Sequence, residues 1–449
     1  MRGRRFIRNT LVLTGVSTAM RLTGLAFQVW LTERAGASGV GLFLLAASVG
    51  AFAATFAISG SRFTVTRLVS EELGRENGRG ALAAVGQCLL YAAVFGLMAT
   101  ALLFSGAGFI GERLIGDGRT VLSLRLLSLD MPFLAMGAVF YGYFTARGQV
   151  FRMAAAQGVE QGVKIAVTAL LLRAVPLGDA EQTCAAVVCG SISGETAGFL
   201  LSLVLFLRDR SYLRGFGGRP RGMLGRILAI APPLAVSAYV RTALTAVCSM
   251  LVPRGLRAYG AAPEAALADY GVIHGMALPI AAFPAALFVA MAEMLVPELT
   301  RAQVRGDADR IRRIVARLLS ACLVFSSAAA LLLVLLADKL GETFYAAPDV
   351  GRYIRALAFL MPVTCLDTVT DGMLRGLGEQ LYAMRVNIAD SVLSLALITL
   401  LLPRFGVRGY VFLLYFTSAF NFALSLRRLW RRVYPDKRPL FLRKSEKIH

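Results

Sequence analysis

Two arginines lie in the middle of long apolar segments, where a charged side chain is costly unless it is paired or faces water. Arg21 shares one helix face with Ser17 and Gln28, because these residues are four and seven positions away. Arg241 shares a face with Ser237 in the same way. A guanidinium in a cleft of low dielectric can hold a phosphate or pyrophosphate through two parallel hydrogen bonds. The alternative is that each arginine neutralises a carboxylate in its own half of the chain.

Carboxylates in the same kind of segment could serve a cation. Asp367 and Asp371 are four residues apart on one helix face, and Asp390 lies in the next apolar segment. They could bind Na⁺ or H⁺ as a coupling ion, or they could pair with arginines, and the sequence leaves both interpretations open. Glu160 and Lys164 are also four apart, and we expect them to neutralise each other.

Nothing in the sequence indicates an enzyme. It has no Walker A loop, no HExxH motif and no nucleophile elbow. Its six cysteines include no CxxC pair, and only two histidines accompany them. We therefore expect no catalytic activity, no cofactor and no bound metal, and we interpret the cysteines as small core residues.

The segments that carry these charges are long enough to cross a membrane. Of the 449 residues, 57% are hydrophobic and 17% are charged, against about 25% charged in an average soluble domain. The apolar residues form blocks of about 20, the length that a helix needs to cross a bilayer. Open β structure is excluded, because backbone in lipid must be hydrogen-bonded within its own helix. The expected spans are 7–31, 40–60, 81–104, 121–145, 152–174, 183–207, 226–250, 267–292, 314–337, 353–375, 383–402 and 407–426.

The basic residues predict the orientation of these spans. Of the 48 Lys and Arg residues, 33 lie at the N terminus, in loops after even-numbered spans or in the tail, and 10 lie in loops after odd-numbered spans. Because Lys and Arg concentrate on the cytoplasmic side, both termini are expected in the cytoplasm. These loops also explain the net charge of +21 through contact with anionic lipids, so nucleic acid is not an expected partner.

The chain also repeats itself. Three pairs of segments match in the same order, with offsets that grow slowly, which indicates an internal duplication. An even number of spans separates the copies, so both copies have the same orientation and are related by an axis along the membrane normal. The matched segments are Val16–Arg21 with Val236–Arg241, Leu68–Glu71 with Leu295–Glu298, and Arg125, Met131 and Pro132 with Arg355, Met361 and Pro362.

The expected fold is therefore an all-α polytopic membrane protein with about twelve transmembrane helices in two six-helix lobes. The N-terminal lobe is expected over 1–207 and the C-terminal lobe over 226–426. A basic, glycine-rich cytoplasmic linker, 208–225, joins them, and a basic cytoplasmic tail, 427–449, follows. Two lobes of this kind are typical of an alternating-access transporter.

Several segments resemble the family of stage V sporulation protein B and related oligosaccharide flippases. This family belongs to the multidrug, oligosaccharidyl-lipid and polysaccharide exporter superfamily, which includes the lipid II flippases. The resemblance extends over nearly the whole chain. The segments that carry it are Phe6–Thr14, Arg21–Gly24, Gly36–Phe43, Ser61–Phe63, Arg67–Glu72, Pro132–Phe133, Tyr141–Phe144 and Gln157–Gln161.

The resemblance implies a function in the bacterial plasma membrane. Relatives of this kind move a polyprenyl-pyrophosphate-linked saccharide, such as lipid II or a polysaccharide precursor, and arginines of their first and later helices line the cavity. Arg21 and Arg241 match those places. Many relatives have two further C-terminal helices that build a lipid-tail groove, and we do not expect that groove here. The alternatives are a cation-coupled multidrug exporter and a membrane scaffold in envelope or spore assembly.

Overall fold

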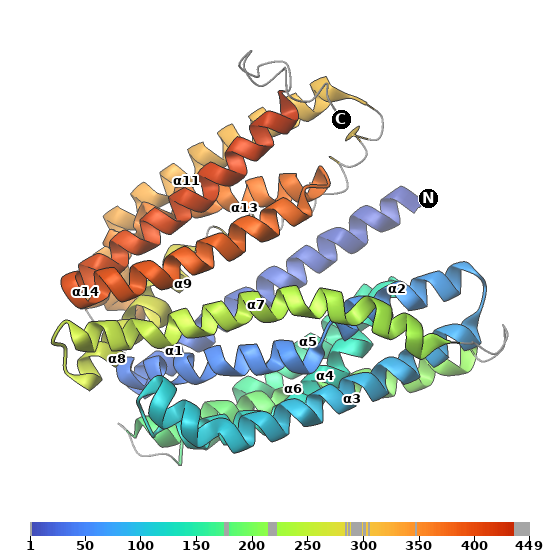
Figure 1. Ribbon diagram of the computed structural model, residues 1–449, viewed down its shortest axis with the longest axis horizontal. Helices are drawn as coiled ribbons and strands as arrows, with labels where there is room; N and C mark the ends of the chain where they lie inside the picture. The colour runs from blue at the N-terminus through green and yellow to red at the C-terminus, as the bar shows by residue number, and fades with distance from the viewer. Residues whose placement is uncertain are drawn as a thin grey trace. The chain divides into compact units, whose positions relative to one another are not determined.

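The computed structural model describes residues 2–174, 179–213, 222–282, 285, 288, 299, 302–303, 306–345 and 348–434. Helices make up nearly all of this part of the chain, and it contains no strand (Figure 1). Seven of the helices are long and apolar enough to cross a membrane, and a bent pair adds an eighth. The all-helical, multi-span architecture expected from the hydropathy pattern is confirmed.

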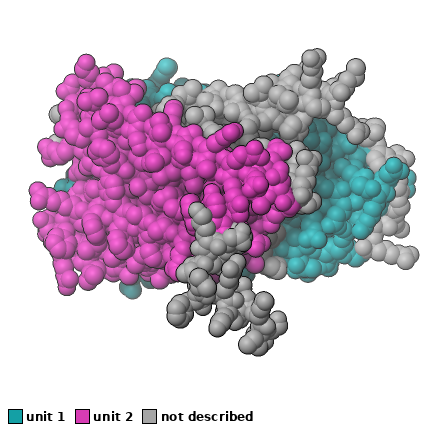
Figure 2. All heavy atoms as spheres, turned by 90° about the horizontal axis from the view of Figure 1, so that it is seen from above, with its two compact units in different colours: residues 1–254, 262–271 teal, residues 255–261, 272–449 magenta. Residues whose placement is uncertain are grey.

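The chain divides into two compact units, coloured teal and magenta in Figure 2. Unit 1 comprises residues 1–254 and 262–271, and unit 2 comprises residues 255–261 and 272–449. The helices that begin in unit 1 are α1 (Arg2–Ile58), α2 (Ser61–Gly74), α3 (Gly78–Gly108), the π-helical turn η1 (Phe109–Ile115), α4 (Thr120–Ala146), α5 (Val150–Leu171), α6 (Ala180–Leu213), α7 (Met223–Ala258) and α8 (Pro263–Gly271). Those of unit 2 are η2 (Val272–Ala277), α9 (Leu278–Ala282), α11 (Ala308–Tyr345), α12 (Pro348–Ala358), α13 (Leu360–Gly376) and α14 (Gln380–Val433).

Two long helices each contain two of the expected spans. α1 breaks at Gly36, where φ is 67°, and α14 breaks at Gly406, where φ is 55°. Glycine is suited to both positions because side chains rarely tolerate a positive φ. The expected span 353–375 is instead divided between α12 and α13, which are bent by 51°. The bend falls just before Pro362, whose ring fits the first turn of a helix better than its interior.

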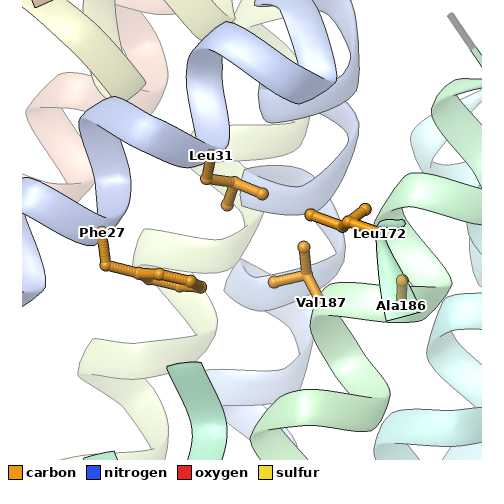
Figure 3. Close-up of a cluster of buried hydrophobic side chains, with 5 residues drawn as sticks. All are labelled: Phe27, Leu31, Leu172, Ala186 and Val187. Carbon is orange, nitrogen blue, oxygen red and sulfur yellow. The ribbon is translucent and has the colours of Figure 1, made fainter. Parts of the chain in front are cut away.

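A cluster of apolar side chains joins α1 to α5 and α6 within unit 1. Phe27 and Leu31 project from α1 one turn apart, and they meet Leu172, Ala186 and Val187 (Figure 3). All five side chains are buried. Close packing of these side chains fixes the first part of α1 against α6 and against α5, which carries Glu160 and Lys164.

Helices α3 and α4 approach each other closely at a glycine. A Cβ added at Gly96 would lie 2.8 Å from the Cα of Pro132. One turn further along α3, Thr100 donates a hydrogen bond of 2.8 Å to the carbonyl oxygen of Ser128. The approach of Gly96 to Pro132 is backbone against backbone, so rotation of a side chain cannot relieve it.

Gly96→Ala should therefore destabilise the protein. We expect the free energy of unfolding to fall by about 1 to 3 kcal/mol, because overpacking forces the two helices apart. Gly86→Ala is the matched control, since Gly86 lies on the same helix and a Cβ there would have no neighbour within 4 Å. That variant should be unchanged or up to about 1 kcal/mol more stable, because alanine favours helix. Thermal unfolding in detergent measures both, and equal melting temperatures would contradict the packing argument.

Candidate functional site

Arg241 lies in the middle of α7 and its side chain is exposed. No carboxylate of a described residue forms an ion pair with it. Gln28 is half-buried in α1. The side chains of Ser17, Arg21 and Ser237 lie outside the part of the structure that is described. The expected pairing of Arg21 with Arg241 therefore stays a prediction.

The contacts of α7 explain why Arg241 is left exposed. The hydroxyl of Tyr239 donates a hydrogen bond of 2.6 Å to Ser59, and Thr55 donates one of 3.3 Å to Thr242. Tyr239 and Thr242 thus mark the side of α7 that packs on the second half of α1. Because a helix turns by about 100° per residue, Arg241 projects to a different side from both.

An ion-pair cluster attaches the first turn of α7 to α2. The guanidinium of Arg226 lies 2.7 Å from Glu72 and also bonds Glu71. Glu72 is buried and accepts a further hydrogen bond of 2.8 Å from the side chain of Asn77. A buried carboxylate with two donors is well satisfied, so this cluster holds the end of α7 in place.

The three acids proposed for a coupling ion lie close to one another in unit 2. Asp367 interacts electrostatically with both Asp371 and Asp390. Asp371 is buried and accepts weak hydrogen bonds from Asn387, at 3.5 Å, and Ser425, at 3.4 Å. The structure thus brings residues from α13 and both halves of α14 to one place.

One oxygen of Asp367 and one of Asp390 are buried and have no hydrogen-bond partner among the described residues. A buried carboxylate oxygen that lacks a donor carries a large desolvation cost, which a bound cation or a proton relieves. Among the described residues, no group of three or more His, Cys, Asp or Glu side chains is arranged to hold a metal ion.

A second group of charges, in unit 1, was only partly predicted. The carboxyl groups of Glu160 on α5 and Glu195 on α6 lie within electrostatic range of each other, and Lys164 and Asp130 interact electrostatically with them. Glycine at position 194 lets α6 approach α5, since a Cβ there would lie 2.6 Å from the carbonyl oxygen of Glu160. The i to i+4 spacing showed the pair on α5, but nothing in the sequence showed that α4 and α6 add two acids.

A third cluster, which sequence reasoning missed, lies where α4, α5 and α6 meet. Asp209 is buried near the end of α6 and accepts a hydrogen bond of 2.5 Å from Tyr143. Arg147 and Arg152 form ion pairs with it at 3.4 and 3.2 Å. Gln149 adds a hydrogen bond of 3.2 Å. The cluster joins the turn between α4 and α5 to the end of α6.

Comparison with known proteins gives these sites a family context. The family model MatE matches residues 233–400. Stage V sporulation protein B of Bacillus subtilis (strain 168) is 22% identical over 412 residues, which cover 90% of this chain and 79% of that protein. Sporulation protein YkvU of the same organism is 23% identical over 190 residues, 41% of each chain.

Solved structures share the fold. An inward-facing multidrug resistance MATE family transporter of the MOP superfamily gives a TM-score of 0.75 at 15% identity, and the match covers 93% of this chain and 95% of that one. An outward-facing structure of such a transporter gives 0.65 at 16% identity, over 96% and 95%. A MOP superfamily transporter from Pyrococcus furiosus gives 0.65 at 14% identity, over 96% of each chain.

These likenesses confirm the expected fold class, an all-α polytopic membrane protein with about twelve transmembrane helices in two lobes. The curated relatives and the matched family model agree with the resemblance noted in the sequence. The chain thus resembles stage V sporulation protein B in sequence and the MATE family transporters of the MOP superfamily in fold.

Proposed function

We propose that this chain is a flippase that moves a polyprenyl-pyrophosphate-linked saccharide across the bacterial plasma membrane by alternating access. The observation that carries the proposal is the exposed Arg241, with no ion pair to a described carboxylate, in the middle of α7, which contains the expected span 226–250. An arginine that neutralised an acid of its own half would have that acid beside it. An arginine that awaits an anionic ligand would not, so this arrangement supports a phosphate-bearing substrate.

In this mechanism the headgroup binds between two equivalent positions of the internal repeat. Arg21 with Ser17 and Gln28 would hold one side of the pyrophosphate, and Arg241 with Ser237 the other. The polyprenyl chain would stay in lipid while rocking of the lobes, 1–207 and 226–426, exposes the headgroup on the opposite side. With both termini cytoplasmic, the direction is from the cytoplasm outwards.

Depletion of the protein tests this function against its rivals. Lipid extracts of depleted cells should contain an accumulated lipid-linked saccharide, because its headgroup is made inside and cannot cross unaided. Increased drug sensitivity without such accumulation would support an exporter. Neither change would support a scaffold in envelope or spore assembly and would contradict transport.

A cation-coupled multidrug exporter is the second candidate, and a specific observation favours it. Asp367 interacts electrostatically with Asp371 and Asp390, and Asp367 and Asp390 each have a buried oxygen that no described residue hydrogen-bonds. The solved structures named above include multidrug transporters with this fold. A site for Na⁺ or H⁺ is compatible with transport of a lipid-linked saccharide or of a drug. The depletion experiment therefore distinguishes the two functions, and the dependence of transport on a Na⁺ or pH gradient identifies the energy source.

Asp367→Asn should remove the ion dependence of transport. The amide keeps the shape of the side chain but lacks the negative charge that attracts a cation and cannot carry a transferable proton, so uptake into proteoliposomes should no longer respond to a Na⁺ or pH gradient. Asp338→Asn is the control, because Asp338 is 63% exposed and pairs with Arg355 at 2.5 Å. Loss of the response in both variants, or in neither, would count against the site.

A further inference from the structure

An apolar groove lies on unit 1 between the second half of α1, η1 and α7. It encloses about 260 Å³. Its walls are the side chains of Val49 and Phe52 from α1, Ile110 and Leu114 from η1, and Ala243, Ala246, Val247, Met250 and Leu251 from α7. Two of the lining residues are well exposed, Val247 at 42% and Leu114 at 38%, so the groove opens to its surroundings.

One end of the groove is cationic. Arg254 is the only charged residue among the described residues that line it, and its guanidinium donates to the carbonyl oxygen of Arg113. This bond uses one of five donors, so the others remain for a ligand. The side chain of Arg113 itself is exposed on η1. The groove therefore combines an apolar wall with the guanidinium of Arg254 at one end.

The sequence builds this shape locally. Within η1 the chain forms a wider π-helical turn, which brings Ile110 and Leu114 to the same wall. Such turns are uncommon and occur often at functional sites. On α7, Ala243 and Ala246 are small and leave room where a larger side chain would close the groove.

We propose that this groove binds the prenyl chain of the lipid-linked substrate, with its phosphate group at Arg254. This inference rests on the proposed function and adds to it a place for the lipid tail. An apolar chain ending in an anion matches apolar walls that end in a cation, since burial of the chain is favourable and arginine binds phosphate through paired hydrogen bonds. A single groove suits one long chain better than the two acyl chains of a phospholipid.

The depth of the groove fits a lipid in one leaflet. Val49 and Phe52 lie near the middle of the expected span 40–60, whereas Arg254 and Arg113 follow the ends of the expected spans 226–250 and 81–104. If both termini are cytoplasmic, as expected, the C-terminal ends of these two spans lie at the outer face of the membrane. The bound molecule would have its phosphate at the outer surface and its chain pointing to the middle of the membrane, as a flipped product does.

Photocrosslinking tests the groove directly. The probe is a polyprenyl phosphate with a diazirine on its prenyl chain, added to the full-length protein in vesicles of phosphatidylethanolamine and phosphatidylglycerol. We expect labelled peptides from α7 and η1. Ala243→Phe should reduce this labelling about tenfold, because the ring occupies the space of the chain. Val240→Phe, on the same helix, exposed and outside the groove, should label like the wild type.

Two results would overturn the inference. One is equal labelling of the Ala243→Phe and Val240→Phe proteins. The other is equal labelling of the wild type by a diazirine phospholipid at the same concentration, which would make this a general lipid site. Arg254→Gln should weaken labelling by the polyprenyl phosphate probe but not labelling by a probe that ends in an alcohol.

Transport of the lipid-linked saccharide is measured separately. Labelling of the groove without flipping by the wild type would refute the proposed function alone, whereas flipping with labels elsewhere would refute the groove alone.

Discussion

Arg241→Ala should abolish flipping of a lipid-linked saccharide in reconstituted vesicles. Removal of one partner from a desolvated, hydrogen-bonded charge pair costs about 2 to 5 kcal/mol, which corresponds to a loss of about 30-fold or more. Because the side chain is exposed and no described carboxylate pairs with it, its removal strands no buried acid. Membrane level and melting temperature should therefore stay near those of the wild type.

Arg241→Lys should keep part of the activity, because lysine retains the charge but loses the two parallel donors. Arg125→Ala is the matched control. Arg125 is also an exposed arginine within an expected span, but its guanidinium lies 5.7 Å from the centre of the Phe104 ring, and we expect it to be dispensable for transport. Arg21→Ala should behave like Arg241→Ala. Abundant, stable and fully active proteins from both substitutions would refute the headgroup site.

The sequence predicted the helices well because a bilayer permits few alternatives. A run of about 20 apolar residues has to become a helix, and the breaks at Gly36 and Gly406 fall within the short gaps left between expected spans. The bend between α12 and α13 was not predicted, because proline in a membrane helix is common and does not by itself reveal a break. The lobe boundaries at residues 207 and 226 remain a prediction.

The sites were less predictable because they depend on contacts between distant segments. Spacing along one helix placed Asp367 and Asp371 on a common face, but only packing brings Asp390 beside them. Hydropathy likewise marks α7 as an apolar helix without showing that its alanines leave a groove beside η1. Such features arise from helix packing, which a pattern within one segment does not encode.

The cluster around Asp209 shows how the duplication preserves a role while exchanging its charges. Gln149 and Glu379 occupy equivalent positions, 230 residues apart, directly after α4 and α13. In unit 1 the turn supplies arginines to an acid on α6, whereas in unit 2 the turn supplies Glu379 to Arg428 and Arg432 at 2.9 and 3.4 Å. In both copies ion pairs join the same turn to the last helix of the copy. Preservation of the link despite reversed charges indicates that it stabilises each unit.

Asp209→Ala should consequently destabilise unit 1 strongly. The substitution removes the carboxylate that forms ion pairs with Arg147 and Arg152, and it strands the buried hydroxyl of Tyr143. Breaking a buried ion pair by removing one partner costs about 3 kcal/mol or more. The protein should unfold at a clearly lower temperature in detergent and accumulate poorly in the membrane.

Glu264→Ala provides the contrast for that measurement. Arg119 forms a hydrogen-bonded ion pair of 2.8 Å with Asp117, which raises the pKa of Arg119, and it reaches the exposed Glu264 only at 3.3 Å. Loss of this solvated contact should change the free energy of unfolding by less than about 1 kcal/mol. If Asp209→Ala proved as mild as Glu264→Ala, water would be replacing the lost carboxylate, and the cluster would not be what holds α4, α5 and α6 together.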